Sequence, residues 1–202
     1  MRYVTAIGAC LLFATHLDGA ACSPPQKPVI PPPQNQPQPQ STADARALTE
    51  FNTRVQDYVQ MHQRLEATLP ALPKETNPTV IDKHERALEK LIRTERKNAR
   101  PGDILTSAAR RALRQRLAQV FTGGKGAQLK ATILDENPGP IALTVNSRYP
   151  DQVPLSTVPP QVLSALPPLP DELEYRFIGE RMILLDVHSH TIADYMENVF
   201  PG

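Results

Sequence analysis

Apolar and polar residues follow a helical period in the first part of the chain and a strand period near its end. Over residues 43–69 the apolar positions recur at intervals of three and four, which places them on one face of an amphipathic helix. The same spacing predicts a second helix from the N-cap Asn77 to just before Pro101, and a third over about residues 103–121. Prolines and the glycine pair at 123–124 close these segments, because neither residue suits a helix interior.

The carboxy-terminal residues carry the clearest strand pattern of the chain. Residues 173–178, 182–187 and 192–196 predict an antiparallel meander of three strands, joined by turns at 179–181 and 188–191. The last segment also fits helical spacing, so a short terminal helix over about 192–200 is the alternative there. Its neighbours are strands, and this favours the strand.

Shorter elements are expected between the helices and the meander. Residues 129–134 and 141–145 are strand candidates, and residues 161–166 predict a single helical turn within extended, proline-rich chain. The sequence TGGKG at 122–126 lacks the spacing of a phosphate-binding loop. We interpret it as a helix stop followed by a flexible connector.

Helices followed by a sheet predict an α+β fold, in which helices cover the apolar face of the sheet. Residues 43–202, roughly 160 residues, suit a single domain. Within this domain we expect a three-helix part over 43–124, packed on a β-rich part over 125–202 that contains the small antiparallel meander.

The amino terminus has the three-part layout of a secretory signal peptide over residues 1–21. Arg2 precedes an apolar run at 3–17, and small residues at 19–21 lie directly before Cys22. The apolar run is too short for a stable membrane span, which needs about 20 residues. We therefore expect an exported protein of the cell envelope, on the periplasmic side or the outer surface.

The small residues before Cys22 resemble the lipobox of bacterial lipoproteins, although Gly19 stands where that motif usually carries Leu, Val or Ile. The resemblance implies a lipid on Cys22 and, through it, attachment to a membrane. Residues 22–42 are rich in Pro and Gln, which favours an extended, disordered linker between anchor and domain. Cleavage near Ala21 without lipidation, which gives a soluble exported domain, is the alternative.

The net charge of +1 hides a separation of charge along the chain. Residues 83–130 are basic and residues 131–202 are acidic, so the two parts can dock on one another or form solvated faces. The alternative is a basic surface for an anionic membrane or an acidic envelope protein, formed by Arg93, Arg96, Lys97, Arg110, Arg111 and Arg114. Nucleic acid is not expected as a partner, because no aromatic residues interleave with these side chains to stack bases.

The sequence ILLDVHSH at 183–190 ends an apolar strand in Asp186, His188 and His190. It resembles the first metal-binding strand of the amidohydrolase and related metal-dependent phosphoesterase families. That resemblance implies that His188 and His190 bind a divalent metal, with Asp186 as a supporting carboxylate. A polar turn without any metal or other cofactor is the simpler interpretation. Only twelve residues follow His190, so further ligands would come from the set His62, His84, Glu180, Asp194 and Glu197.

The segment from residue 153 to the end resembles the carboxy-terminal part of a group of bacterial exported proteins, through LPPLP at 166–170, EYRF at 174–177 and LLD at 184–186. That group has no assigned activity, so the resemblance implies no catalytic residue. We therefore expect an exported envelope protein, lipid-anchored at Cys22, with a binding or structural role. The alternatives are a metal-binding or metal-dependent hydrolytic protein, and a soluble exported domain without an anchor.

Overall fold

The computed structural model describes residues 39–73, 77–136 and 141–201. The predicted signal peptide, Cys22 and nearly all of the predicted linker lie outside these residues. Among the helices of the described ranges, none combines the length and the apolar character that a membrane span requires.

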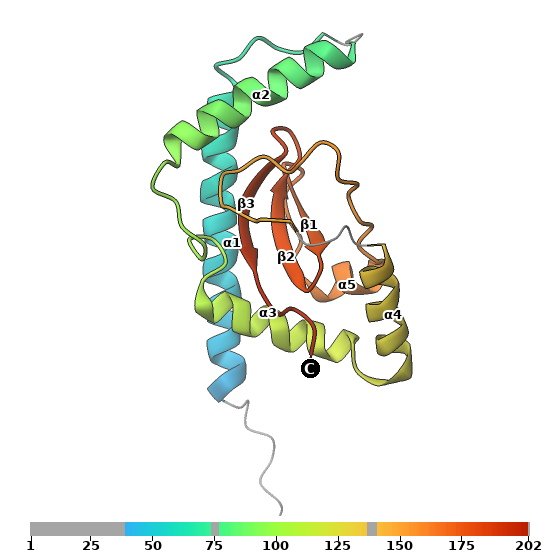
Figure 1. The fold of residues 1–202 in the computed structure, drawn as a ribbon. Coiled ribbons are helices and arrows are strands. Elements are labelled where there is room, and N and C mark those ends of the chain that lie inside the picture. Colours follow the sequence, from blue (N-terminus) through green and yellow to red (C-terminus); the bar gives the residue numbers. More distant parts are fainter. Residues whose placement is uncertain (1–38, 74–76, 137–140, 202) are drawn as a thin grey trace, which may run out of the picture. The chain divides into compact units, whose positions relative to one another are not determined.

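The described chain combines helices with one antiparallel sheet, so the predicted α+β class is confirmed (Figure 1). Three of the helices overlap the segments that the apolar spacing predicts, with shorter bounds for the second and third, and a short helix lies where a helical turn is expected at 161–166. In chain order the elements are α1 (Pro39–Glu66), α2 (Pro78–Glu95), α3 (Ser107–Val120), α4 (Gly123–Asp135), α5 (Pro160–Ala165), β1 (Leu173–Ile178), β2 (Arg181–Asp186) and β3 (Thr191–Met196).

Side-chain caps fix where two of the helices begin. The Asn77 side chain accepts a hydrogen bond from the amide of Val80, and Pro78 occupies the first turn of α2. The Thr106 side chain accepts a hydrogen bond from the amide of Ala109 at the start of α3. Each cap satisfies an amide that has no partner inside its own helix.

The predicted strands at 129–134 and 141–145 are wrong. The first lies inside α4, because a short apolar run fits a buried helix as well as a strand, and Ile133 is buried on the inner side of that helix. The second belongs to an extended segment that forms no strand. The predicted TGGKG connector is also wrong, since Gly123, with a φ of 74°, opens α4 directly after α3.

The strands form a meander in the order β1-β2-β3, so β2 is the central strand. Asp186, the last residue of β2, pairs with Leu173 of β1 on one side and with Thr191 of β3 on the other. The carboxy-terminal segment is strand β3, and the alternative of a terminal helix at this place is wrong.

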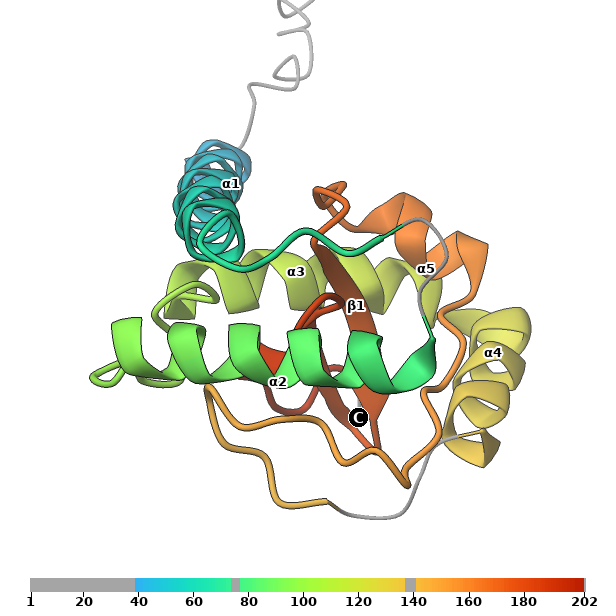
Figure 2. The same ribbon diagram turned by 90° about the horizontal axis from the view of Figure 1, so that it is seen from above.

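The two faces of the sheet are covered by different parts of the chain (Figures 1 and 2). One face packs on α1, α3 and α5 in the main core, which includes Phe51, Leu113, Val162, Phe177, Met182 and Leu184. The other face is covered by the extended segment that follows residue 141, in a smaller cluster of Tyr149, Ile178, Ile183, Leu185 and Ile192. Because both faces are covered, the carboxylate of Asp186 at the end of β2 is enclosed by protein.

Candidate metal centre

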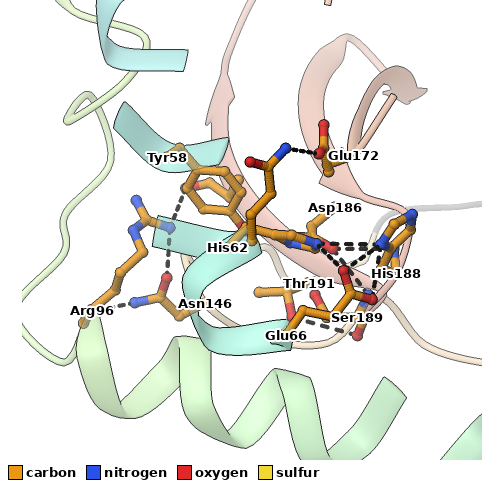
Figure 3. A network of polar contacts seen from close by, with 12 residues as sticks. Tyr58, His62, Glu66, Arg96, Asn146, Glu172, Asp186, His188, Ser189 and Thr191 are labelled. Atoms are coloured by element: carbon orange, nitrogen blue, oxygen red, sulfur yellow. Dashed lines mark hydrogen bonds and ion pairs between the residues drawn. The ribbon is translucent and has the colours of Figure 1, made fainter. Parts of the chain in front are cut away.

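Asp186 is a fully buried carboxylate at the end of the central strand (Figure 3). Its Oδ2 accepts a hydrogen bond from the Tyr58 hydroxyl at 2.9 Å and one from His62 Nδ1 at 2.6 Å. Its Oδ1 accepts from the backbone amides of His188 and Ser189, at 3.1 and 2.9 Å. Both oxygens are therefore used inside the protein, and the carboxylate joins α1 to the turn between β2 and β3.

Helix α1 presents three polar residues to this turn at intervals of four, Tyr58, His62 and Glu66, so that they lie on one helix face. The ring of Tyr58 is buried, and burial, followed by the charge of Asp186, holds the pKa of its hydroxyl well above the ordinary value. Tyr58 is therefore a neutral donor to Asp186 at any ordinary pH.

His62 lies between Asp186 and a second polar group. Its side chain is completely buried, and while Nδ1 is directed at Asp186, Nε2 lies 3.3 Å from Glu66 Oε2 and 3.3 Å from His188 Nδ1. Burial opposes a charge on the ring, but the hydrogen bond and charge of Asp186, aided by Glu66, outweigh it and raise the pKa of His62.

Glu66 and His188 complete a cluster with His62 (Figure 3). His188 Nδ1 lies 3.1 Å from Glu66 Oε1 and 3.2 Å from Glu66 Oε2. Burial raises the pKa of Glu66, but hydrogen bonding to His188 and the charges of both histidines outweigh it, so that this pKa is lowered. On α2, His84 Nε2 lies 3.5 Å from Glu66 Oε1, beside the cluster.

The spacing of these atoms suits a bound metal ion. One ligand atom each from His62, Glu66 and His188 lies within 4.8 Å of the other two. With Oε2 as the ligand atom of Glu66, the three distances measure 3.2 to 3.3 Å. Atoms that bind zinc tetrahedrally at about 2.0–2.1 Å lie about 3.3–3.4 Å from one another. The donors are two imidazoles and one carboxylate, a set that zinc and neighbouring divalent ions accept.

The cluster opens to solvent on one side. The His62 side chain is 0% exposed, whereas those of Glu66 and His188 are 31% and 42% exposed. An ion held by these three side chains would therefore have at least one open coordination position for water or another ligand. Such open coordination distinguishes catalytic and ligand-binding zinc sites from closed structural ones.

The structure separates the residues of the predicted D-x-H-x-H site. His188 lies in the cluster, and Asp186 lies behind it as the hydrogen-bond partner of His62. His190 does not belong to the cluster: it has a left-handed backbone with a φ of 51°, and its carbonyl accepts from the amide of Tyr149. Because residues 188–190 form a tight turn and not an extended strand, the two histidines do not act side by side.

Two residues of the cluster lie far from this motif in the sequence. His62 is among the additional ligands that the sequence suggests, and Glu66 is missing from that set. A signal for both exists in the sequence, since His62 and Glu66 are four residues apart on an amphipathic helix, a spacing that brings two side chains together on one face. Nothing in the sequence indicates that this face meets the turn at 187–190.

Asp194 is buried at another place in the fold. Its Oδ2 accepts hydrogen bonds from the amides of Ile104 and Leu105 at 2.9 and 2.8 Å, and Gly102 donates to both of its oxygens. This carboxylate fixes the loop between α2 and α3. Its oxygens are taken up by that loop, and Asp194 does not belong to the metal cluster.

The predicted basic surface is divided by contacts within the protein. The guanidinium of Arg96 lies 5.0 Å from the centre of the Tyr58 ring and donates to Asn146 and to the carbonyl of Ala193. Arg114 donates to the backbone carbonyls of residues 197 and 198. The other members are Arg93 beside Glu89, Arg110 beside Asp194, Arg111 beside Asp44, and the exposed Lys97. A membrane or protein partner for these residues stays a prediction.

Comparisons of this chain with protein families, with curated proteins and with solved structures find no match. The function is therefore inferred from the geometry of the site.

Proposed function

We propose that this protein is an exported cell-envelope protein that binds one divalent transition-metal ion, of the zinc class, through His62 Nε2, the Glu66 carboxylate and His188 Nδ1. The observation that carries the proposal is the triangle formed by His62 Nε2, Glu66 Oε2 and His188 Nδ1, whose sides measure 3.2 to 3.3 Å. The proposed role of the protein is metal binding at an open site, which is one of the functions that the sequence suggests.

Hydrogen bonds alone account poorly for this triangle. His62 uses Nδ1 for Asp186, so that its Nε2 carries at most one more proton, and this atom faces both Glu66 and His188. If both nitrogens donate to Glu66, two N–H groups lie 3.3 Å apart with no attraction between them. A single cation among the three atoms interacts favourably with all of them at once.

Asp186 supports the proposal because it accepts a hydrogen bond from the other ring nitrogen of the proposed ligand His62. Histidines that bind metals usually donate their other ring N–H to a carboxylate or carbonyl, which fixes the tautomer and the ring orientation. His62 has this arrangement, with Asp186 held in turn by Tyr58 and by two backbone amides. The free Nε2 of His62 is thus oriented toward Glu66 and His188 before any metal arrives.

Zinc titration of the purified full-length protein by calorimetry tests the proposal. We expect one zinc ion per chain. In His188→Ala the affinity for zinc should fall by about 100-fold or more, which is a larger effect than is usual for residues that only hydrogen-bond to a metal ligand. His190→Ala is the matched control from the same turn and should bind zinc like the wild type. Equal zinc binding by His188→Ala and the wild type would contradict the proposal.

The envelope part of the proposal is supported by the signal-peptide pattern and by Cys22. Intact mass and detergent partitioning of the protein from a bacterial host, beside a Cys22→Ser variant, test it separately. We expect an acyl-sized mass increase on a chain that starts at Cys22, abolished in the variant. A water-soluble, unmodified product from both genes would contradict lipid anchoring and would have no bearing on the proposed metal site.

A further inference from the structure

An apolar groove lies beside the metal cluster, between the chain that leaves α1 and the first turns of α2. It has a volume of about 350 Å³, at the lower end of the range for small-molecule sites. Two of its apolar side chains are well exposed, Leu72 at 42% and Val80 at 43%. Leu69, Pro70 and Ala87 also line it. Adjacent apolar side chains that remain open to water indicate a binding surface.

His84 connects this groove to the metal cluster. It lines the groove, and its Nε2 lies 3.5 Å from Glu66 Oε1. The side chain of His84 is only 10% exposed, so it occupies the inner end of the groove. His84 therefore lies between the groove and the Glu66 carboxylate, and a ligand in the groove would approach the metal beside these two residues.

An open position on the metal ion and Lys83, an exposed lysine on α2 that lines the groove, favour an anionic head group. The Glu66 carboxylate is in the cluster itself, and that of Asp186 lies on the far side of the His62 ring. Apart from Lys83 and His84, the lining side chains are apolar. They offer no partner to the amide groups of a peptide, whose desolvation without hydrogen bonds is costly.

We propose that the groove and the metal together bind a small aliphatic carboxylate, with its carboxylate on the metal ion and its alkyl tail in the groove. The inference rests on the proposed metal site and names the class of ligand that this site takes. Each methylene that enters the groove is expected to strengthen binding by up to about fourfold.

The experiment is calorimetric titration of the zinc-loaded, full-length protein with butanoate and with octanoate, repeated on zinc-free protein. We expect octanoate to bind at least about tenfold more tightly than butanoate, and both to require zinc. Equal affinity for the two acids, or equal octanoate binding without zinc, would overturn the inference while zinc binding itself stands. Absence of zinc binding would overturn both proposals.

Val80→Glu places a carboxylate in the groove and should remove most of the preference for octanoate, with zinc affinity unchanged. Leu155→Glu, at a similarly exposed apolar residue outside the groove, is the matched control and should keep the preference. If Val80→Glu folds poorly, Ala87→Leu takes its place as the groove variant. It fills the groove from α2 with a helix-compatible residue and should likewise remove most of the preference for octanoate. Unchanged octanoate preference in a folded groove variant would overturn the inference.

Discussion

At the scale of single residues, one carboxylate with four hydrogen-bond donors around it holds the candidate site together. Asp186 accepts from Tyr58, from His62 and from the amides of two residues in the following turn. An ionised carboxylate is the only side chain of this size that accepts from four donors. Its replacement by any isosteric group leaves a donor without a partner.

Asp186→Asn is therefore expected to lower the free energy of unfolding of the zinc-free protein by about 2–4 kcal/mol. The NH2 group of asparagine is a donor and would face groups that are donors themselves, so that hydrogen bonds are lost. Zinc affinity should fall by about 10–100-fold, because His62 loses the partner that orients it. Glu172→Gln, which alters a carboxylate that accepts from the exposed Gln63, is the control and should cost less than about 1 kcal/mol. Urea denaturation measures the stability of both variants. Equal stability of Asp186→Asn and Glu172→Gln would contradict this role of Asp186.

The stability of the zinc-free protein should depend on pH through His62 and Glu66. The pKa of His62 is raised above 6.5, so its stabilising contribution is complete below about 6.5 and is lost as the pH rises through the raised value. The pKa of Glu66 is lowered below 4.5, so its contribution is present above about 4.5 and is lost as the pH falls through the lowered value.

The free energy of unfolding from these two groups should thus be greatest between about pH 4.5 and pH 6.5. Urea denaturation from below about pH 4.5 to well above about pH 6.5 measures both declines, with His62→Gln as the comparison. In that variant the decline on the alkaline side should be weaker. An alkaline decline of the same size in the variant and the wild type would show that His62 does not cause it.

At the scale of elements, the apolar spacing predicts the three longer amphipathic helices and the meander correctly. It fails for the short apolar segments at 129–134 and 141–145. The caps at Asn77 and Thr106 act through local hydrogen bonds, which sequence patterns represent well. The run at 129–134 is too short for its period to separate helix from strand, and packing in the core decides in favour of α4. Tertiary packing thus overrides a weak local signal.

The corner between α3 and α4 depends on a close approach at Gly126. A Cβ atom on this residue would lie 2.3 to 2.7 Å from backbone atoms of Phe121, which cannot move without displacing the end of α3. Gly126→Ala is therefore expected to destabilise the fold by about 2–4 kcal/mol, in the range of other severe packing defects. Thermal unfolding followed by circular dichroism measures the effect.

Gly124→Ala is the matched control in the same turn of α4, because nothing lies within 4 Å of its added Cβ. Alanine favours helix by up to about 1 kcal/mol over glycine, so this variant should be as stable as the wild type or more stable. Similar destabilisation by both substitutions would show that the TGGKG segment needs flexibility and not close packing.

At the scale of the whole molecule, the candidate site joins segments that are far apart in the chain. His62 and Glu66 come from α1, His188 comes from the turn after β2, and His84 lies beside them on α2. The sequence marks the turn as polar and gives the spacing of His62 and Glu66. It does not reveal which helix face meets which turn, because that depends on how the helices dock on the sheet.

Because the ligands come from different elements, metal binding should stabilise the whole fold. Zinc at a concentration 100 times its dissociation constant is expected to raise the free energy of unfolding by about 2.7 kcal/mol. Differential scanning calorimetry with and without zinc measures this, and a chelator should reverse it. His190→Ala should show the same increase as the wild type, and an equal increase in His188→Ala would assign the effect to other residues.

The most direct test of the metal site is anomalous diffraction from crystals of the zinc-loaded protein, recorded on both sides of the zinc absorption edge. We expect one zinc peak about 2.0–2.2 Å from His62 Nε2, the Glu66 carboxylate and His188 Nδ1, with His62 Nδ1 still hydrogen-bonded to Asp186. A zinc peak on His190 alone, or no peak among these three side chains, would contradict it.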